Sequence, residues 1–174
     1  MTKYLAIDFE TATHHCDSAC AVGLTLFNDI TELQSFYTVI RPPSEEFEFT
    51  HIHGITWETI KNEKPFDQVW PYVSHMIEAA DYFVAHNAPF DRSVLSACCT
   101  AADIDMPGQP FICTLKLVRQ HYRFNPARLS DVCDRLNIPL SHHHAASDSS
   151  ACAKVLQHAL SQGVNPEDYV IGET

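Results

Sequence analysis

The chain has 174 residues, a length that allows one domain with a single buried core. Hydrophobic residues make up 45% of it and charged residues 19%, a balance that is typical of globular proteins and excludes a disordered chain. Acidic residues outnumber basic ones by 22 to 11. The resulting formal net charge of -11 argues against a nucleic-acid binder that depends on a broad cationic surface.

The sequence shows no signal that directs the chain to a membrane or out of the cell. No apolar run is long enough to span a bilayer, and residues 1–8 lack the pattern of a cleaved signal peptide. The seven cysteines are an odd number without the spacing of a disulfide framework, which favours reduced thiols. We therefore expect a cytoplasmic protein without membrane contact.

The first part of the chain predicts an antiparallel meander. Three apolar runs of strand-like composition are separated by short, turn-like connections, and they cover residues 4–10, 19–27 and 33–40. Short connections favour antiparallel neighbours, so these runs are expected to pair in sequence order.

Helical periodicity begins near residue 66. Val69, Val73, Met76 and Ile77 share one face of a helix predicted over residues 66–80, in which Pro71 is tolerated because it is expected to fall in the first turn. Further short strands are predicted over 82–85 and 111–113, and further helices near 89–99, 114–121, 129–136 and 146–161. Strands that alternate with helices after a meander predict an α/β domain with a mixed sheet.

The domain is expected to cover residues 1–163. Ala151, Val155 and Ala159 predict a buried stripe on the last helix, and Gly163 is its expected stop. Residues 164–174 contain a proline and several acids, so we interpret them as a surface-bound or loose C-terminal tail.

Two acids close the first predicted strand. In the segment AIDFET, Asp8 and Glu10 project from one face of the strand while Ile7 and Phe9 point to the other. Neighbouring carboxylates raise each other's pKa unless a cation lies between them, and Mg²⁺ or Mn²⁺ prefers such oxygen ligands. The alternative interpretation is a solvated strand end that carries two unrelated acids.

Two later segments carry further acids at element boundaries. Asp91 lies in the first turn of a predicted helix and follows His86 and Asn87, and Asp148 lies near the start of the last helix, five positions after His143. Taken singly, each aspartate is also explained as an acid that is favourable at a helix N-terminus.

Two transition-metal interpretations are less favoured. The histidines at 142–144 are consecutive, and consecutive residues rarely converge on one ion. Cys16 and Cys20, with His14 and His15 beside them, lack a second ligand pair at a suitable spacing, so we interpret them as ordinary residues of a turn and a strand.

Taken together, the three acidic segments resemble the DEDDh branch of the DEDD exonuclease superfamily. This group contains the proofreading subunit of bacterial replicative polymerases, RNase T and oligoribonuclease. Asp8 and Glu10 match its first motif (here AIDFET), Asp91 matches the second (HNAPFD), and His143 with Asp148 matches the third, H-x-x-x-x-D. Three motifs in the family's order form a far more specific pattern than any one of them.

The resemblance covers roughly residues 4–160 and includes HGIT at 53–56, which is similar to a substrate-side loop of the proofreading-like members. It implies an RNase H-like fold, in which helices flank a mixed five-stranded sheet made of an antiparallel meander plus parallel strands. It also implies that Thr11, His53 and Asn87 contact the terminal nucleotides of the substrate.

The resemblance further implies a metal-dependent 3′→5′ exonuclease that releases 5′-mononucleotides. Two Mg²⁺ or Mn²⁺ ions would stabilise the attacking and leaving oxygens of the reaction. Asp8 would bridge the two ions, Glu10 and Asp148 would complete the first site, and Asp91 would act on the second, partly through water. His143 would be the general base, a role that suits a group titrating near neutral pH.

Two positions bear on these assignments. His142 and His144 flank His143, and only the five-residue offset to Asp148 selects the middle residue. Cys113 stands where many relatives carry an acid, so a supporting carboxylate is missing there. We interpret Cys113 as a small buried residue.

The expected substrate is the 3′ end of single-stranded DNA, because AIDFET and HGIT are most similar to the proofreading-like members. A ribonuclease that trims short RNA or RNA 3′ ends is the alternative within the enzyme class. A non-catalytic, polymerase-associated nucleic-acid-binding module is the alternative outside it, although the presence of all four acids and the histidine argues against it. The resemblance allows a DNA polymerase as a partner, and the sequence leaves the oligomeric state open.

Overall fold

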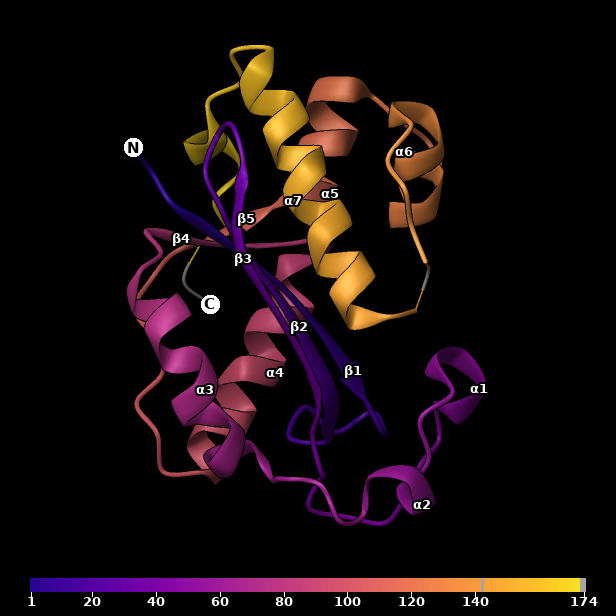
Figure 1. Cartoon of the computed structure of the whole chain (residues 1–174). Helices are drawn as coiled ribbons and strands as arrows, with labels where there is room; N and C mark the ends of the chain where they lie inside the picture. Colours follow the sequence, from indigo (N-terminus) through magenta and orange to yellow (C-terminus); the bar gives the residue numbers. More distant parts are fainter. Residues whose placement is uncertain (142, 173–174) are drawn as a thin grey trace.

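A computed structural model describes residues 1–141 and 143–172. Its centre is a five-stranded sheet with the strand order β3-β2-β1-β4-β5 (Figure 1). The strands β1 (Tyr4–Thr11), β2 (Ala19–Phe27) and β3 (Glu32–Val39) pair as an antiparallel meander. The short strands β4 (Tyr82–Ala85) and β5 (Phe111–Cys113) continue the sheet in parallel with β1. The predicted mixed five-stranded sheet is confirmed.

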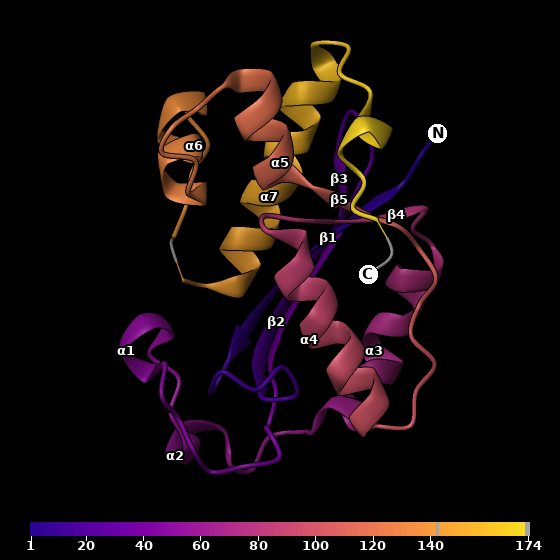
Figure 2. The same ribbon diagram turned by 180° about the vertical axis from the view of Figure 1, so that it is seen from behind.

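Helices cover both faces of this sheet (Figures 1 and 2). On one face, α3 (Phe66–Glu78) and α4 (Ala88–Ala101) pack against Leu5, Ile7 and Phe9 of β1. On the other face, α7 (Ala145–Ser161) packs against Tyr4 and Ala6, together with α5 (Thr114–Leu117) and α6 (Leu129–Leu136). The strict alternation along β1 therefore separates two hydrophobic clusters.

The structure differs from the predictions at its shortest elements. The helices α1 (Thr50–His53), α2 (Trp57–Ile60) and η2 (Pro166–Tyr169) were not predicted, since four residues are too few to show a period. The helix predicted over 114–121 is instead α5 followed by a π-helical turn, η1 (Val118–Tyr122).

The prediction that Pro71 falls in a first helical turn is wrong. The helix α3 begins at Phe66, so Pro71 lies in its second turn, where a proline removes a backbone hydrogen bond at a cost of about 3 kcal/mol. Val69, Val73 and Met76 of α3 are all buried against the sheet. Their burial offsets the local cost, and the helix continues to Glu78.

Two features of the sheet position the acidic residues. The strand β1 pairs with β2 along its whole length, but with β4 only from Tyr4 to Ala6, so its last residues extend beyond the end of β4. Gly23 of β2 lies opposite Asp8, and a Cβ atom there would lie 2.0 Å from the carbonyl oxygen of Ala145 at the start of α7. This close approach brings the N-terminal turn of α7 over the end of β1.

The C-terminal segment follows the edge of the sheet as far as the structure describes it. Val170 forms an antiparallel bridge with Ile112, and the backbone amide of Ile171 donates to the carbonyl of Phe111 at 2.9 Å. Lys116 Nζ donates to the carbonyl of Asp168 at 2.9 Å. No helix in the described ranges has both the length and the hydropathy required to cross a bilayer.

Candidate active site

Three carboxylates meet at the end of β1. Asp8 and Glu10 lie on the same face of β1, and Asp148 lies on the first turn of α7. One ligand oxygen from each lies within 4.8 Å of the others. Residues from the two ends of the chain therefore form one group of oxygen ligands, which is the donor chemistry that Mg²⁺ and Mn²⁺ prefer.

Asp91 joins this group from a third element. It is buried in the first turn of α4, and its Oδ1 accepts a hydrogen bond from the backbone amide of Phe9 at 3.1 Å. The amide is available because β1 has passed the end of β4 at this point. Asp91 is therefore held directly beside the strand that carries Asp8 and Glu10.

The pKa values of the four acids are all raised above their ordinary values. Burial raises the pKa of Asp91 to about 8 and that of Glu10 to about 7. The pKa of Asp8 lies well above its ordinary value because of burial and because Asp91, Asp148 and Glu10 surround it. Burial also raises the pKa of Asp148 to about 6. Four ionised carboxylates at this site require a cation, so the donor set fits a bound divalent metal.

The loop before α7 brings a histidine to the same site. The backbone amide of His143 donates to Asp148 Oδ2 at 3.2 Å, and His143 has a left-handed backbone with a φ of 61°. The His143 side chain is exposed, and the backbone hydrogen bond and charge of His143 offset part of the rise that burial causes in the pKa of Asp148. The ring of His144 stacks on Tyr37 of β3, with the two ring centroids 4.6 Å apart. His142 lies outside the described residues.

The three predicted substrate contacts have different environments. Thr11 is buried, and its carbonyl oxygen lies 3.2 Å from Nε2 of His53. The backbone amide of Ile55 donates to Nδ1 of His53 at 3.0 Å, which requires a neutral ring with its proton on Nε2. Burial lowers the pKa of His53, in agreement with a neutral ring. Asn87 caps α4 with a left-handed φ of 84° and lies four residues before Asp91.

A cavity of about 430 Å³ opens beside Glu10. Its lining is rich in aromatic and imidazole rings, and it includes Phe49, His53, Phe90, His14, His15 and Thr11. The phenyl ring of Phe90 is 42% exposed. Flat rings beside a carboxylate cluster provide a surface on which a nucleobase can stack.

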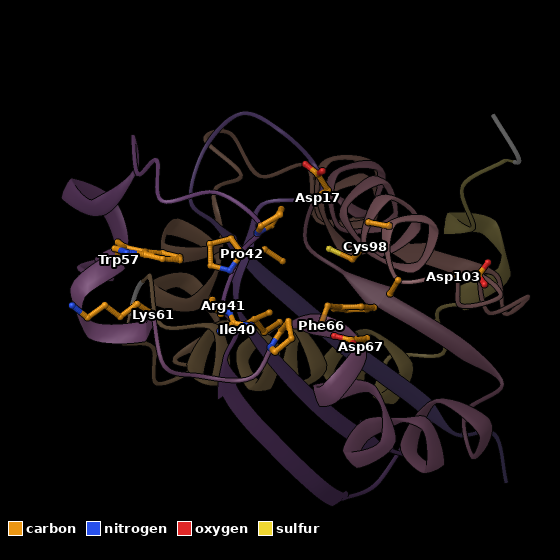
Figure 3. Close-up of a pocket in the computed structure, with 15 residues that line it drawn as sticks. Asp17, Ile40, Arg41, Pro42, Trp57, Lys61, Phe66, Asp67, Cys98 and Asp103 are labelled. Atoms are coloured by element: carbon orange, nitrogen blue, oxygen red, sulfur yellow. The ribbon is translucent and has the colours of Figure 1, made fainter.

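Figure 3 shows a larger cavity, of about 700 Å³. It is lined by residues from β2, the chain after β3, α2, α3 and the end of α4, among them Arg41, Trp57, Lys61, Phe66 and Cys98. None of the four acids lines it. Glu10 lines the smaller cavity, so that cavity and not the larger one adjoins the acidic group.

Sequence reasoning missed several residues that support the site. Gly23 allows α7 to approach β2, and its signal in the sequence is a glycine inside an otherwise apolar strand. His86 bonds through Nδ1 to Thr114 Oγ1 at 3.0 Å and through Nε2 to the carbonyl of Ala127 at 2.9 Å. These bonds hold the segment that leads to Asp91. Cys113 is buried, as its interpretation as a small apolar residue predicted.

Known proteins are similar to this chain in sequence. Residues 5–156 match a family model described as an exonuclease. The DNA polymerase III PolC-type of Thermotoga petrophila is 28% identical over 157 residues, which cover 87% of this chain and 11% of that protein. The corresponding protein of Streptococcus suis is 31% identical over 131 residues, 74% of this chain and 9% of that one. The chain thus spans about a tenth of the length of these relatives.

Solved structures support the same fold. Exonuclease X in complex with 5′ overhanging duplex DNA has a TM-score of 0.76 at 21% identity, with 97% of each chain covered. The nuclease domain of 3′hExo, described as a DEDDh family member bound to rAMP, has a TM-score of 0.80 at 16% identity and covers 99% and 97%. Exonuclease I of E. coli with a dT13 oligonucleotide has a TM-score of 0.82 at 14% identity, with 97% of this chain and 43% of that chain covered.

Proposed function

Because this chain belongs to the exonuclease family whose model matches residues 5–156, we propose that it removes nucleotides from the 3′ end of single-stranded DNA and releases 5′-mononucleotides. The observation that carries the proposal is the meeting of Asp8, Glu10 and Asp148 within 4.8 Å, with Asp91 hydrogen-bonded to the same strand. Such a group is unfavourable without cations and suited to phosphoryl chemistry with them.

The acids have separate roles in this proposal. Two Mg²⁺ or Mn²⁺ ions, when bound, would supply Lewis acidity to the attacking water and to the leaving oxygen. Asp8 would bridge the two ions, Glu10 and Asp148 would complete the first site, and Asp91 would act on the second, partly through water. The hydrogen bond from Phe9 to Oδ1 of Asp91 supports this role, because it fixes one oxygen and orients the carboxylate.

His143 would act as the general base. Its side chain is exposed, and its backbone amide donates to Asp148 Oδ2 at 3.2 Å. An imidazole is suited to accept a proton near neutral pH. The stacking of His144 on Tyr37 supports the choice of His143, because it engages the neighbouring ring elsewhere.

The terminal nucleotide would occupy the cavity beside Glu10. Phe49 and Phe90 offer rings for base stacking there, and Thr11 and Asn87 flank the acids. His53 would contact the nucleotide through its ring face, because both of its nitrogens already bond within the protein. Its further role would be to hold the HGIT loop against the end of β1.

A ribonuclease that trims RNA 3′ ends is the second candidate. Among the structural neighbours, one was solved with rAMP and another with a dT13 oligonucleotide, so this fold accommodates both kinds of nucleotide. We favour DNA because the PolC-type relatives are DNA polymerases by name, and a DNA polymerase is the partner that this relationship suggests. A non-catalytic binding module is disfavoured by the complete set of acids at the site.

The decisive experiment measures mononucleotide release from 3′-labelled single-stranded DNA and RNA, with Mg²⁺, with Mn²⁺ and with a chelator. We expect faster release from DNA, no release with the chelator, and no release by Asp8→Asn. Full Mg²⁺-dependent turnover by Asp8→Asn would contradict the two-metal site. Faster release from RNA would establish the second candidate instead.

A further inference from the structure

The basic residues of this acidic chain are unevenly distributed. Residues 106–130 contain no Asp or Glu, although the chain as a whole has 22 acids against 11 Lys and Arg. The same stretch carries four of the eleven cations, namely Lys116, Arg119, Arg123 and Arg128. A local excess of positive charge therefore occurs in a molecule whose net charge is -11.

Part of the positive charge of this stretch is engaged in contacts within the protein. Lys116 bonds to the carbonyls of Asp168 and Val170, and its Nζ lies 6.0 Å from the centroid of the Tyr169 ring. Arg119, Arg123 and Arg128 are instead exposed, and within residues 1–141 and 143–172 none of them forms an ion pair with a carboxylate. We call these three residues the arginine surface.

The arginine surface lies close to the candidate active site. The carbonyl of Ala127, next to Arg128, accepts a hydrogen bond from His86 at 2.9 Å, and His86 directly precedes Asn87. Burial lowers the pKa of His86, and the nearby charge of Arg119 lowers it further. Figure 2 shows α5 and α6, which the arginine-bearing segment joins, on the side of the sheet that α7 covers. The segment thus flanks the helix that carries Asp91 and the helix that carries Asp148.

We infer that the arginine surface binds backbone phosphates of the substrate strand on the 5′ side of the nucleotide that is removed. This inference rests on the proposed function and extends it from the terminal nucleotide to the strand behind it. A nucleic-acid strand is repelled by an acidic protein, so it is expected to follow a path along exposed arginines. The planar guanidinium group is well suited to phosphate because it can donate two parallel hydrogen bonds.

The inference specifies a substrate class. An enzyme that uses this surface prefers strands several nucleotides long over dinucleotides, because a dinucleotide has no phosphate far enough from the scissile bond to reach it. It also reconciles the net charge of -11 with nucleic-acid binding, since the stretch that carries these arginines contains no acid.

The test compares the wild type with the triple variant R119Q/R123Q/R128Q on two substrates, a long single-stranded oligonucleotide and an unphosphorylated thymidine dinucleotide. For the long strand we expect KM to rise on the order of tenfold with kcat retained, since phosphate contacts contribute affinity and not chemistry. For the dinucleotide we expect both constants to remain unchanged, which also shows that the variant is folded. The matched control, K3Q/K61Q/K64Q, removes the same charge from other parts of the surface and should leave both substrates unchanged.

A binding measurement completes the test and does not require turnover. Asp8→Asn and its combination with the triple variant are titrated with the long strand over a range of salt concentrations, using fluorescence anisotropy. We expect the slope of log Kd against log salt to fall by about 2, because each single-strand phosphate contact contributes about 0.7. An unchanged slope, an equal loss of activity on both substrates, or a larger effect of the lysine control would each overturn the inference. A wild type without nuclease activity would instead contradict the proposed function and leave this binding measurement intact.

Discussion

At the scale of single residues, the defining feature of the site is a group of carboxylates that the fold holds close together. Asp8 illustrates the conflict, because it is surrounded by Asp91, Asp148 and Glu10 and its pKa lies well above the ordinary value. A carboxylate in this position destabilises the metal-free protein when it ionises. The carboxylates that would carry out the proposed chemistry therefore lower the stability of the fold until a cation binds.

Replacement of Asp8 by asparagine tests this conflict directly. Asp8→Asn keeps the shape of the side chain and removes one of four mutually repelling charges, so we expect a higher Tm than the wild type at pH 8 in the presence of a chelator. Activity should be lost in the same variant. Thermal unfolding followed by circular dichroism is the measurement, and a lower Tm under these conditions would show that the repulsion is already relieved in some other way.

The assignment of His143 makes a second prediction at this scale. We expect His143→Ala to reduce kcat by about 10²–10⁴, which is the usual contribution of a general base, with little change in Tm. His144→Ala is the matched control and should retain activity, since its ring stacks on Tyr37 instead. His142→Ala is expected to behave like the control. Equal losses in all three variants would defeat the choice of the middle histidine.

At the scale of elements, the site depends on how closely α7 approaches the sheet. Gly23 makes contact with the start of α7 possible, and two positions along β2 the hydroxyl of Thr25 bonds to Ser149 of α7 at 3.1 Å. Asp148 lies between these two anchor points along the chain of α7. The packing of one helix on one strand thus sets the distance between Asp148 and the acids of β1.

Gly23→Ala is therefore expected to damage both stability and activity. The new Cβ atom would lie 2.0 Å from the Ala145 carbonyl oxygen, so α7 must shift, at a cost of about 1–3 kcal/mol. A displacement of Asp148 by about 1 Å would lower kcat by about a hundredfold. Gly108→Ala is the control, because no atom lies within 4 Å of its added Cβ. Similar denaturation midpoints and similar kcat values for the two variants would contradict this account.

These elements also show which parts of the molecule can be predicted from sequence. Periodicity identified β2, β4, β5 and α6 with correct bounds, and motif spacing identified the acids that meet at the site. The four-residue helices α1, α2 and η2 escaped prediction because four residues are too few to show a helical period.

The internal bonds of His53 also escaped prediction. Its two partners, the carbonyl of Thr11 and the amide of Ile55, are backbone groups. The sequence of residue types does not reveal which backbone groups a side chain will contact. The tautomer of the His53 ring could therefore be inferred from the structure but not from the sequence.

At the scale of the whole molecule, the acidic site links protonation, metal binding and stability. The pKa values of Asp91, Glu10 and Asp148 rise to about 8, 7 and 6 on folding, and that of Asp8 rises well above its ordinary value. The folded protein therefore binds more protons than the unfolded chain between the two sets of pKa values. By linkage, the free energy of unfolding must then fall as pH increases through that range.

The metal-free protein should accordingly lose stability from about pH 4, where the unfolded carboxyls titrate, up to about pH 8, where Asp91 releases its proton in the folded state. Mg²⁺ or Mn²⁺ binds the ionised carboxylates of the folded form, so it should raise Tm strongly at pH 8 and weakly at pH 5. The measurement is Tm against pH, with a chelator and with each ion, for the wild type and for Asp8→Asn. In Asp8→Asn both the pH dependence and the metal response should be smaller. A metal response in the wild type that is equal at pH 5 and pH 8 would mean that the ions bind elsewhere, because the raised pKa values of Glu10, Asp91 and Asp148 make the charge of this site differ between these two conditions.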